Sequence, residues 1–121
     1  MTASLLCIAL AVYFEARGEP TAGQLAVAQV ILNRVEDRRF PNNACDVVYQ
    51  RHQFSFFWDG KHDRPTDKGA WDQARAVALT ATAINDTTSG ANHYHADYTQ
   101  PYWAEGRTPV RVIGRHVFYR F

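Results

Sequence analysis

Residues 12–20, VYFEARGEP, close an apolar helical segment and carry two carboxylates. The apolar residues before this stretch recur at helical spacing, and Glu15 lies just off their common face. Glu19 follows one turn later, while Gly18 and Pro20 favour a helix end and a turn. We therefore predict that the first helix ends here, with a carboxylate in its last turn.

Further helices are predicted over the next part of the chain. Residues 21–24, TAGQ, fit a capping box that would begin a second helix, whose polar face carries Gln29 and Asn33. A short helix is predicted over residues 44–49. Asp67 is placed to cap a third long helix.

The last third of the chain has a different pattern. Residues 91–98, ANHYHADY, and 110–121, VRVIGRHVFYRF, are rich in aromatic and β-branched residues that alternate along the chain. They predict a small antiparallel sheet with residues 102–109 as a connecting loop. Helices followed by a sheet predict an α+β fold, and the absence of a linker predicts a single domain over residues 1–121.

Composition narrows the class of protein. The net charge of +1 provides no field strong enough to favour nucleic acid, so we expect no nucleic-acid partner. A hydrophobic content of 46% and a charged content of 21% are typical of a globular protein. The apolar segment over residues 4–14 is too short to span a bilayer and reads as a buried helix. We expect a monomer without a membrane span.

Glu15 has two interpretations. A carboxyl partly covered by Tyr13 and Phe14 would lose hydration, and desolvation favours the protonated form. A protonated carboxyl is what a general acid needs to donate to a glycosidic oxygen. Alternatively, Glu15 is an exposed residue that ends a helix and pairs with Arg17 or Arg34.

Glu19 suggests a pair of carboxylates. On a continuous helix it would share a face with Glu15, and two carboxyls about 5–9 Å apart are the usual glycosidase arrangement. Gly18 and Pro20 interrupt the helix between the two residues. Glu19 is therefore predicted to stabilise the start of the second helix, where the macrodipole favours negative charge.

The histidines raise the question of a metal. His93 and His95 would share one face of a strand, and His116 could be a third zinc ligand. No fourth ligand has a recognisable spacing. The favoured interpretation is hydrogen-bonded histidines around a polar groove, so we expect neither a metal nor another cofactor.

Aromatic residues gather in segments predicted as loops or strand edges. Beside Asn, Gln and Asp they suit sugar rings, which have one apolar face and a polar rim. Core packing is the alternative, and it is favoured for Phe118 but not for Trp58 or Trp103. The set comprises Phe54, Phe56, Phe57, Trp58, Tyr94, Tyr98, Tyr102, Trp103, Phe118 and Tyr119.

The chain resembles the SleB-like cell-wall hydrolases, which include spore-cortex-lytic enzymes and related bacterial and phage proteins. The resemblance runs from Leu5 to Tyr119 and rests on several segments in the same order and spacing. These are YFEARGEP, GQLAVAQVILNRVEDRRFPNNACDVVYQ, QFSF, GANHYHADY, PYW and IGRHVFY.

This resemblance implies a lysozyme-like α+β fold and cleavage of peptidoglycan glycan strands between N-acetylmuramic acid and N-acetylglucosamine. It implies a lytic transglycosylase that leaves 1,6-anhydro ends and uses one glutamate, here Glu15. The segment Gln53, Phe54 and Ser55 is expected beside the cleft. Tyr94 and His95 are expected opposite it, and Trp103 is expected to bind substrate.

Further expectations follow from the same resemblance. Cys7 and Cys45 could be two buried thiols or one disulfide, and the family favours the disulfide. Tyr94 is expected to face the groove near Glu15, with His93 and His95 facing the other way. The protein would act at the cell wall or in the periplasm, or as a phage endolysin made in the host cytoplasm and released to the wall.

Three alternatives remain open at this point. The first is a muramidase of the same fold, because hydrolysis needs the same acid. The second is a module that binds peptidoglycan without cutting it. The third is a zinc-dependent amidase or peptidase built on His93, His95 and His116.

Overall fold

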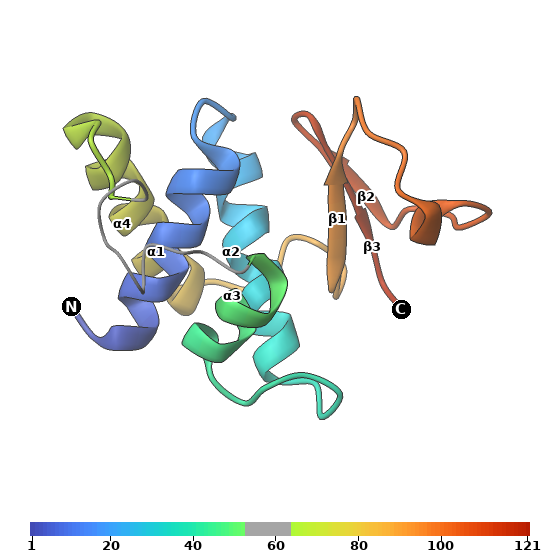
Figure 1. Cartoon of the computed structure of the whole chain (residues 1–121), viewed down its shortest axis with the longest axis horizontal. Helices are drawn as coiled ribbons and strands as arrows, with labels where there is room; N and C mark the ends of the chain where they lie inside the picture. The colour runs from blue at the N-terminus through green and yellow to red at the C-terminus, as the bar shows by residue number, and fades with distance from the viewer. Residues whose placement is uncertain (53–63) are drawn as a thin grey trace.

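The computed structural model describes residues 1–52 and 64–121, and it has four helices beside a small sheet (Figure 1). This arrangement confirms the predicted α+β class. The elements are α1 (Ala3–Ala16), α2 (Thr21–Val35), α3 (Ala44–His52), α4 (Lys68–Ala83), β1 (His93–Ala96), the 3₁₀ helix η2 (Tyr102–Ala104), β2 (Arg111–Ile113) and β3 (His116–Tyr119).

Helix α1 is the central element of the core, and α2, α3 and α4 all pack against it (Figure 1). Every residue from position 7 to position 13 is buried, which is expected of a helix that is apolar all round. Thr2 caps its first turn by accepting a hydrogen bond from the Leu5 amide at 3.2 Å. The helix ends at Ala16, and Gly18 follows with φ of +89°. The predicted end of the first helix is confirmed.

The other helices agree only in part with those predicted from the sequence. Asp67 caps α4, because its Oδ1 accepts a hydrogen bond from the Ala70 amide at 3.0 Å. The capping box at residues 21–24 is wrong, because α2 already begins at Thr21 and Pro20 occupies the cap position. Helix α3 continues to His52, three residues beyond the predicted end. Among the helices of the described residues, none combines the length and apolarity needed to cross a bilayer.

A disulfide joins Cys7 of α1 to Cys45 of α3, with Cα atoms 5.1 Å apart. The two residues are separated by 38 positions in the sequence. The pairing expected from the family resemblance is therefore confirmed. It ties the central helix to the short helix that packs beside it.

The sheet has the strand order β1-β3-β2, and both pairs are antiparallel. The register places Tyr94 opposite Phe118, and both belong to the core that the helices form. The other face of the sheet carries His93, His95 and Tyr119. Among the described strands, β1 lies at an edge of the sheet, so one of its sides is paired with no strand of residues 1–52 and 64–121.

The polar face of α2 holds the segment that leads from α4 to the sheet. The side-chain amide of Asn33 donates to the Ala91 carbonyl at 2.9 Å. Gln29 donates to the Asn85 carbonyl at 3.0 Å and accepts a hydrogen bond from the Thr87 amide at 2.9 Å. These bonds fix the position of the chain just before β1.

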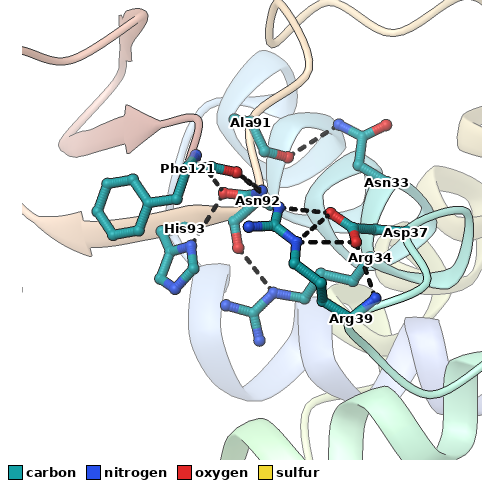
Figure 2. A network of polar contacts seen from close by, with 8 residues as sticks. All are labelled: Asn33, Arg34, Asp37, Arg39, Ala91, Asn92, His93 and Phe121. Atoms are coloured by element: carbon teal, nitrogen blue, oxygen red, sulfur yellow. Dashed lines mark hydrogen bonds and ion pairs between the residues drawn. The ribbon is translucent and has the colours of Figure 1, made fainter.

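Asn92 completes this connection at the start of β1 (Figure 2). Its carbonyl accepts a hydrogen bond from Arg34 Nε at 2.7 Å, and its side chain pairs with the backbone of Phe121 through two bonds of 3.0 Å. Arg39 also donates to the Phe121 carbonyl, at 2.6 Å. Helix α2 thereby determines where β1 lies relative to the helices.

Candidate active site

A cleft of about 620 Å³ lies between the end of α1, the last part of α2 and the strand β1. Its volume falls within the range of about 300–1,000 Å³ that is typical of ligand sites. The described residues that line it are Phe14, Glu15, Arg34, His93, Tyr94, His95, Ala96, Tyr98, Thr99, Trp103 and His116.

Glu15 is half-buried in the last turn of α1 and is the only carboxylate among the described lining residues. Its charge interacts with the guanidinium of Arg34. The side chain of Arg17 instead contacts Tyr13. Its guanidinium donates a hydrogen bond to the Tyr13 hydroxyl, and its Cζ lies 4.5 Å from the centroid of the Tyr13 ring. Of the two partners considered from the sequence, Arg34 is the one that shares the cleft with Glu15.

Arg34 is a buried cation, with 6% of its surface exposed. Its guanidinium lies 4.7 Å from the ring centroid of Phe40, and its Nε donates to the Asn92 carbonyl. Burial lowers the pKa of Arg34 to about 10, and the nearby charge of Glu15 opposes that shift. At neutral pH the side chain is therefore still a cation.

Sequence reasoning did not place Arg34 among the residues that line the site. Its burial depends on Phe40, which is near in sequence, and on Asn92, which comes from a distant segment. The sequence did suggest Arg34 as a possible partner of Glu15, but it did not indicate that this side chain would be buried beside the cleft.

Glu19 lies outside the cleft and contacts the turn between β2 and β3. Its Oε1 accepts a hydrogen bond from the Arg115 amide at 2.9 Å and lies 3.7 Å from His116 Nδ1. Gly114 has φ of +60°, and a Cβ there would lie 3.0 Å from the same carboxylate oxygen. Glu19 therefore anchors the hairpin turn, and it does not form a pair of cleft carboxylates with Glu15.

Strand β1 contributes residues from both of its faces to the cleft. The two histidines do face the other side of the sheet from Tyr94, as expected, but the expectation that they would thereby be kept out of the groove is wrong, because His93, Tyr94 and His95 all line it. The reason is that the cleft runs beside an edge strand. Tyr94 is 7% exposed, and its ring packs 5.1 Å from that of His116 and 5.6 Å from that of Phe118.

The two histidines are held by neighbours on the outer face of the sheet. His95 Nδ1 lies 2.7 Å from the Ala96 carbonyl, which can only accept, so this nitrogen carries a proton. His95 Nε2 lies 2.9 Å from the Tyr119 hydroxyl. His93 Nδ1 lies 2.9 Å from Asn92 Oδ1, and its ring stacks on Phe121 with centroids 4.3 Å apart.

The histidines do not converge on one point. His116 pairs in register with Ala96 and so faces the helices, whereas His93 and His95 face the other side of the sheet. Within residues 1–52 and 64–121, no group of three or more His, Cys, Asp or Glu side chains is arranged to hold a metal ion. This geometry gives no support to the amidase alternative.

The aromatic residues singled out in the sequence lie in different parts of the molecule. Trp103 lines the cleft and packs against His93, His95 and Tyr119, with centroids 5.3–5.6 Å apart. Phe118 is in the core, as expected, while Tyr102 is exposed and does not line the cleft. Phe54, Phe56, Phe57 and Trp58 lie outside the described residues, and so do the predicted site residues Gln53 and Ser55.

Comparisons with known proteins agree with these features. A family model described as Cell Wall Hydrolase matches residues 18–119. A spore cortex-lytic enzyme from Halalkalibacterium halodurans is 38% identical over 92% of this chain and 33% of its own length. One from Bacillus subtilis is 37% identical over 92% of this chain and 35% of its own length. The chain thus spans about a third of the length of these relatives.

Two solved structures have the same fold. The catalytic domain of the Bacillus cereus SleB protein has a TM-score of 0.77 and 35% identity, and the match covers 97% of this chain and 89% of that chain. The catalytic domain of the germination-specific lytic transglycosylase SleB from Bacillus anthracis has a TM-score of 0.80 and 34% identity, with 99% and 96% covered. The expected lysozyme-like α+β fold is confirmed. The family model covers the chain from the residues after α1 to the end of β3, and the two solved structures match nearly the whole chain, so the chain belongs to the cell wall hydrolase family.

Proposed function

We propose that residues 1–121 form one catalytic domain that cleaves peptidoglycan glycan strands between N-acetylmuramic acid and N-acetylglucosamine. The observation that carries this proposal is Glu15, the single carboxylate among the described residues that line a cleft with an aromatic wall. The relatives support it, since they are named spore cortex-lytic enzymes and one solved neighbour is named a lytic transglycosylase.

In the first step Glu15 acts as a general acid. Its carboxyl proton passes to the glycosidic oxygen, and the bond between that oxygen and C1 of the muramyl sugar breaks. Positive charge develops at C1, where the carbonyl oxygen of the substrate's own N-acetyl group stabilises it. The substrate thus supplies the group that a second carboxylate provides in many glycosidases.

In the second step Glu15 acts as a base. Its carboxylate takes the proton from the muramyl 6-hydroxyl, and O6 bonds to C1 to close the 1,6-anhydro ring. The proton that Glu15 gave up is thereby restored. Arg34 lies close enough for its charge to act on Glu15, so it stabilises the carboxylate that exists between the two steps.

A muramidase is the second candidate, because water could replace the 6-hydroxyl as the group that attacks C1. The choice depends on whether water reaches C1 before the ring closes. We favour the transglycosylase because the solved neighbour from Bacillus anthracis carries that name.

Two sets of residues are proposed to bind the substrate. Tyr94, His95 and Trp103 line the cleft and would contact the sugars. Gln53, Phe54 and Ser55 are proposed from the family resemblance alone. The protein would act as a monomer on the wall, outside the cytoplasm, whether a bacterium or a phage encodes it.

The test is mass spectrometry of the fragments released from purified sacculi. Wild-type protein should release muropeptides with 1,6-anhydro ends. Reducing muramyl ends would identify a muramidase, free peptides an amidase, and no release a binding module.

Two glutamine variants test the assigned acid in the same assay. Glu15→Gln keeps the size of the side chain but cannot donate the proton, so release should fall by about 10³–10⁴-fold, the upper part of the range for general acid catalysis. Glu19→Gln keeps an oxygen that can accept from Arg115 and should retain most of the activity. Residual activity of Glu15→Gln above a tenth of wild type, or equal losses in both variants, would reject the assignment.

A further inference from the structure

Tyr98 is an exposed aromatic residue at the rim of the cleft. It lies two residues after the end of β1, and 78% of its surface is open to solvent although it lines the same cleft as Glu15. A side chain left so exposed buries little apolar area and contributes little to folding. Packing within the protein therefore does not explain an aromatic ring at this position.

The turn that carries Tyr98 is fixed on both sides. The Asp97 amide donates to the Arg115 carbonyl at 2.8 Å. The Thr99 amide and hydroxyl both donate to the Ala96 carbonyl, at 3.0 Å and 2.8 Å. The backbone of Tyr98 is thus held between two anchored residues. Because the backbone is already ordered, a ligand that covers the ring restricts only the side-chain rotamers.

We propose that Tyr98 stacks on a sugar ring of the glycan strand, at a position beyond the two sugars joined by the bond that Glu15 cleaves. A pyranose ring has an apolar C–H face, and an exposed aromatic face on a fixed turn is complementary to it. Tyr98 lines the cleft together with Thr99, His95 and Trp103, and His95 contacts both Thr99 and Trp103, so a strand bound at Glu15 would pass along this wall. This inference rests on the proposed function.

Tyr102 provides a matched control four residues along the same connection. It is 89% exposed and begins η2, where its carbonyl accepts a hydrogen bond from the Glu105 amide at 3.2 Å. Unlike Tyr98, it does not line the cleft. The two tyrosines have the same chemistry and similar exposure, and they differ in their position relative to the cleft.

The experiment measures kcat and KM on glycan strands freed of their peptides by an amidase. Tyr98→Ala should raise KM about tenfold and change kcat by less than about twofold, because contacts made equally in ground and transition states affect KM alone. Tyr98→Phe, which keeps the ring, should stay close to wild type. Tyr102→Ala should change both constants by less than about twofold, as expected of a surface substitution.

A parallel binding measurement separates this inference from the proposed function. In a Glu15→Gln background, which binds without cutting, adding Tyr98→Ala should weaken affinity for the same strands about tenfold, and adding Tyr102→Ala should not. If wild type cuts no glycan, the proposed function fails while this comparison still decides the role of Tyr98. Equal values for the two alanine variants, or an effect of Tyr98→Ala confined to sacculi that retain their peptides, would overturn the inference.

Discussion

At the scale of single residues, the cleft places an acid next to a cation that the fold has largely removed from water. Arg34 is held by the Asn92 carbonyl and by the Phe40 ring, so its position does not depend on Glu15. A fixed charge of this kind requires no reorganisation when the neighbouring group changes its protonation state. Arg34 thus has a structural role through Asn92 and an electrostatic role through Glu15.

These two roles predict different effects for two substitutions at Arg34. Arg34→Met should lower the free energy of unfolding by about 1–3 kcal/mol, because the buried Asn92 carbonyl loses its donor. Arg34→Lys should be destabilised too, since an ammonium does not reproduce the guanidinium geometry. The lysine variant keeps the charge, however, and should retain more cleavage activity than the methionine variant.

Denaturant unfolding and initial rates on sacculi, measured below both unfolding transitions, would test this prediction. Equal activity in the two variants would show that the charge of Arg34 is irrelevant to cleavage. A methionine variant as stable as wild type would contradict the structural role. Leu79→Ala, on the exposed side of α4, is a suitable control for changes unrelated to the cleft.

At the scale of elements, the position of the sheet depends on polar contacts between α2 and the segment 85–92. Asp86 contributes to these contacts by accepting hydrogen bonds from the Thr88 amide and hydroxyl at 2.9 Å and 2.7 Å and from the Gly90 amide at 2.7 Å. Burial alone would raise the pKa of Asp86. The hydrogen bonds from Thr88, Gly90 and Asn33 outweigh it and hold that pKa below the usual value.

This shift predicts a pH-dependent effect of Asp86→Asn. Because the pKa of Asp86 is lower in the folded state than the usual value of 3.8, its stabilising effect is fully present above pH 3.8. That effect is lost as the pH falls through the lower, folded-state pKa. The variant should thus be less stable than wild type by about 1 kcal/mol at pH 7, a figure kept small because the residue is partly exposed.

Thermal unfolding of both proteins at pH 7 and near pH 2.5 would measure this difference. The two melting temperatures should approach each other at the acidic pH. A constant difference across the range would argue against the ionised form as the stabilising species. Glu105→Gln, at an exposed position on the β1–β2 connection, should show no comparable trend.

The elements differ in how far the sequence predicted them. Local sequence patterns predicted the end of α1, the cap at Asp67 and the segments that form strands. Each of these predictions is confirmed. The capping box at residues 21–24 failed because Pro20 already occupies the cap position of α2, which places Thr21 inside the helix.

The candidate site was predictable only in part. Glu15 stood out because a carboxylate at the end of an apolar helix is unusual, and it does line a cleft. Arg34 was considered only as a possible partner of Glu15, because its burial depends in part on Asn92, which is distant in sequence. The contribution of both faces of β1 was missed because a pattern of alternation does not reveal which strand lies at an edge.

At the scale of the whole molecule, the helices and the sheet form the two walls of the cleft, and the disulfide joins two of the helices. The bridge closes a segment that includes the whole of α2. A loop of this length restricts the unfolded chain, and the entropic model gives a stabilisation of about 3–4 kcal/mol.

Reduction should therefore lower the melting temperature by about 10 °C or more. Calorimetry with and without a thiol reductant would measure the shift, with thiol titration of the unfolded protein to confirm that the bond is open. The double variant Cys7→Ala, Cys45→Ala should melt at the lower temperature and not respond to the reductant. A fully reduced protein that melts at the same temperature as the oxidised one would contradict this prediction.

The bridge between α1 and α3 also determines at what stage the protein reaches its full stability against unfolding. Cytosolic thiol systems keep cysteines reduced, while disulfides persist in oxidising surroundings. A newly made chain would thus be at its least stable in the cell that synthesises it, where proteases remove molecules that open often. The chain would gain its full lifetime only after oxidation, on the side of the membrane where the wall lies. Under the proposed function, that difference would limit the damage done by molecules that stay behind.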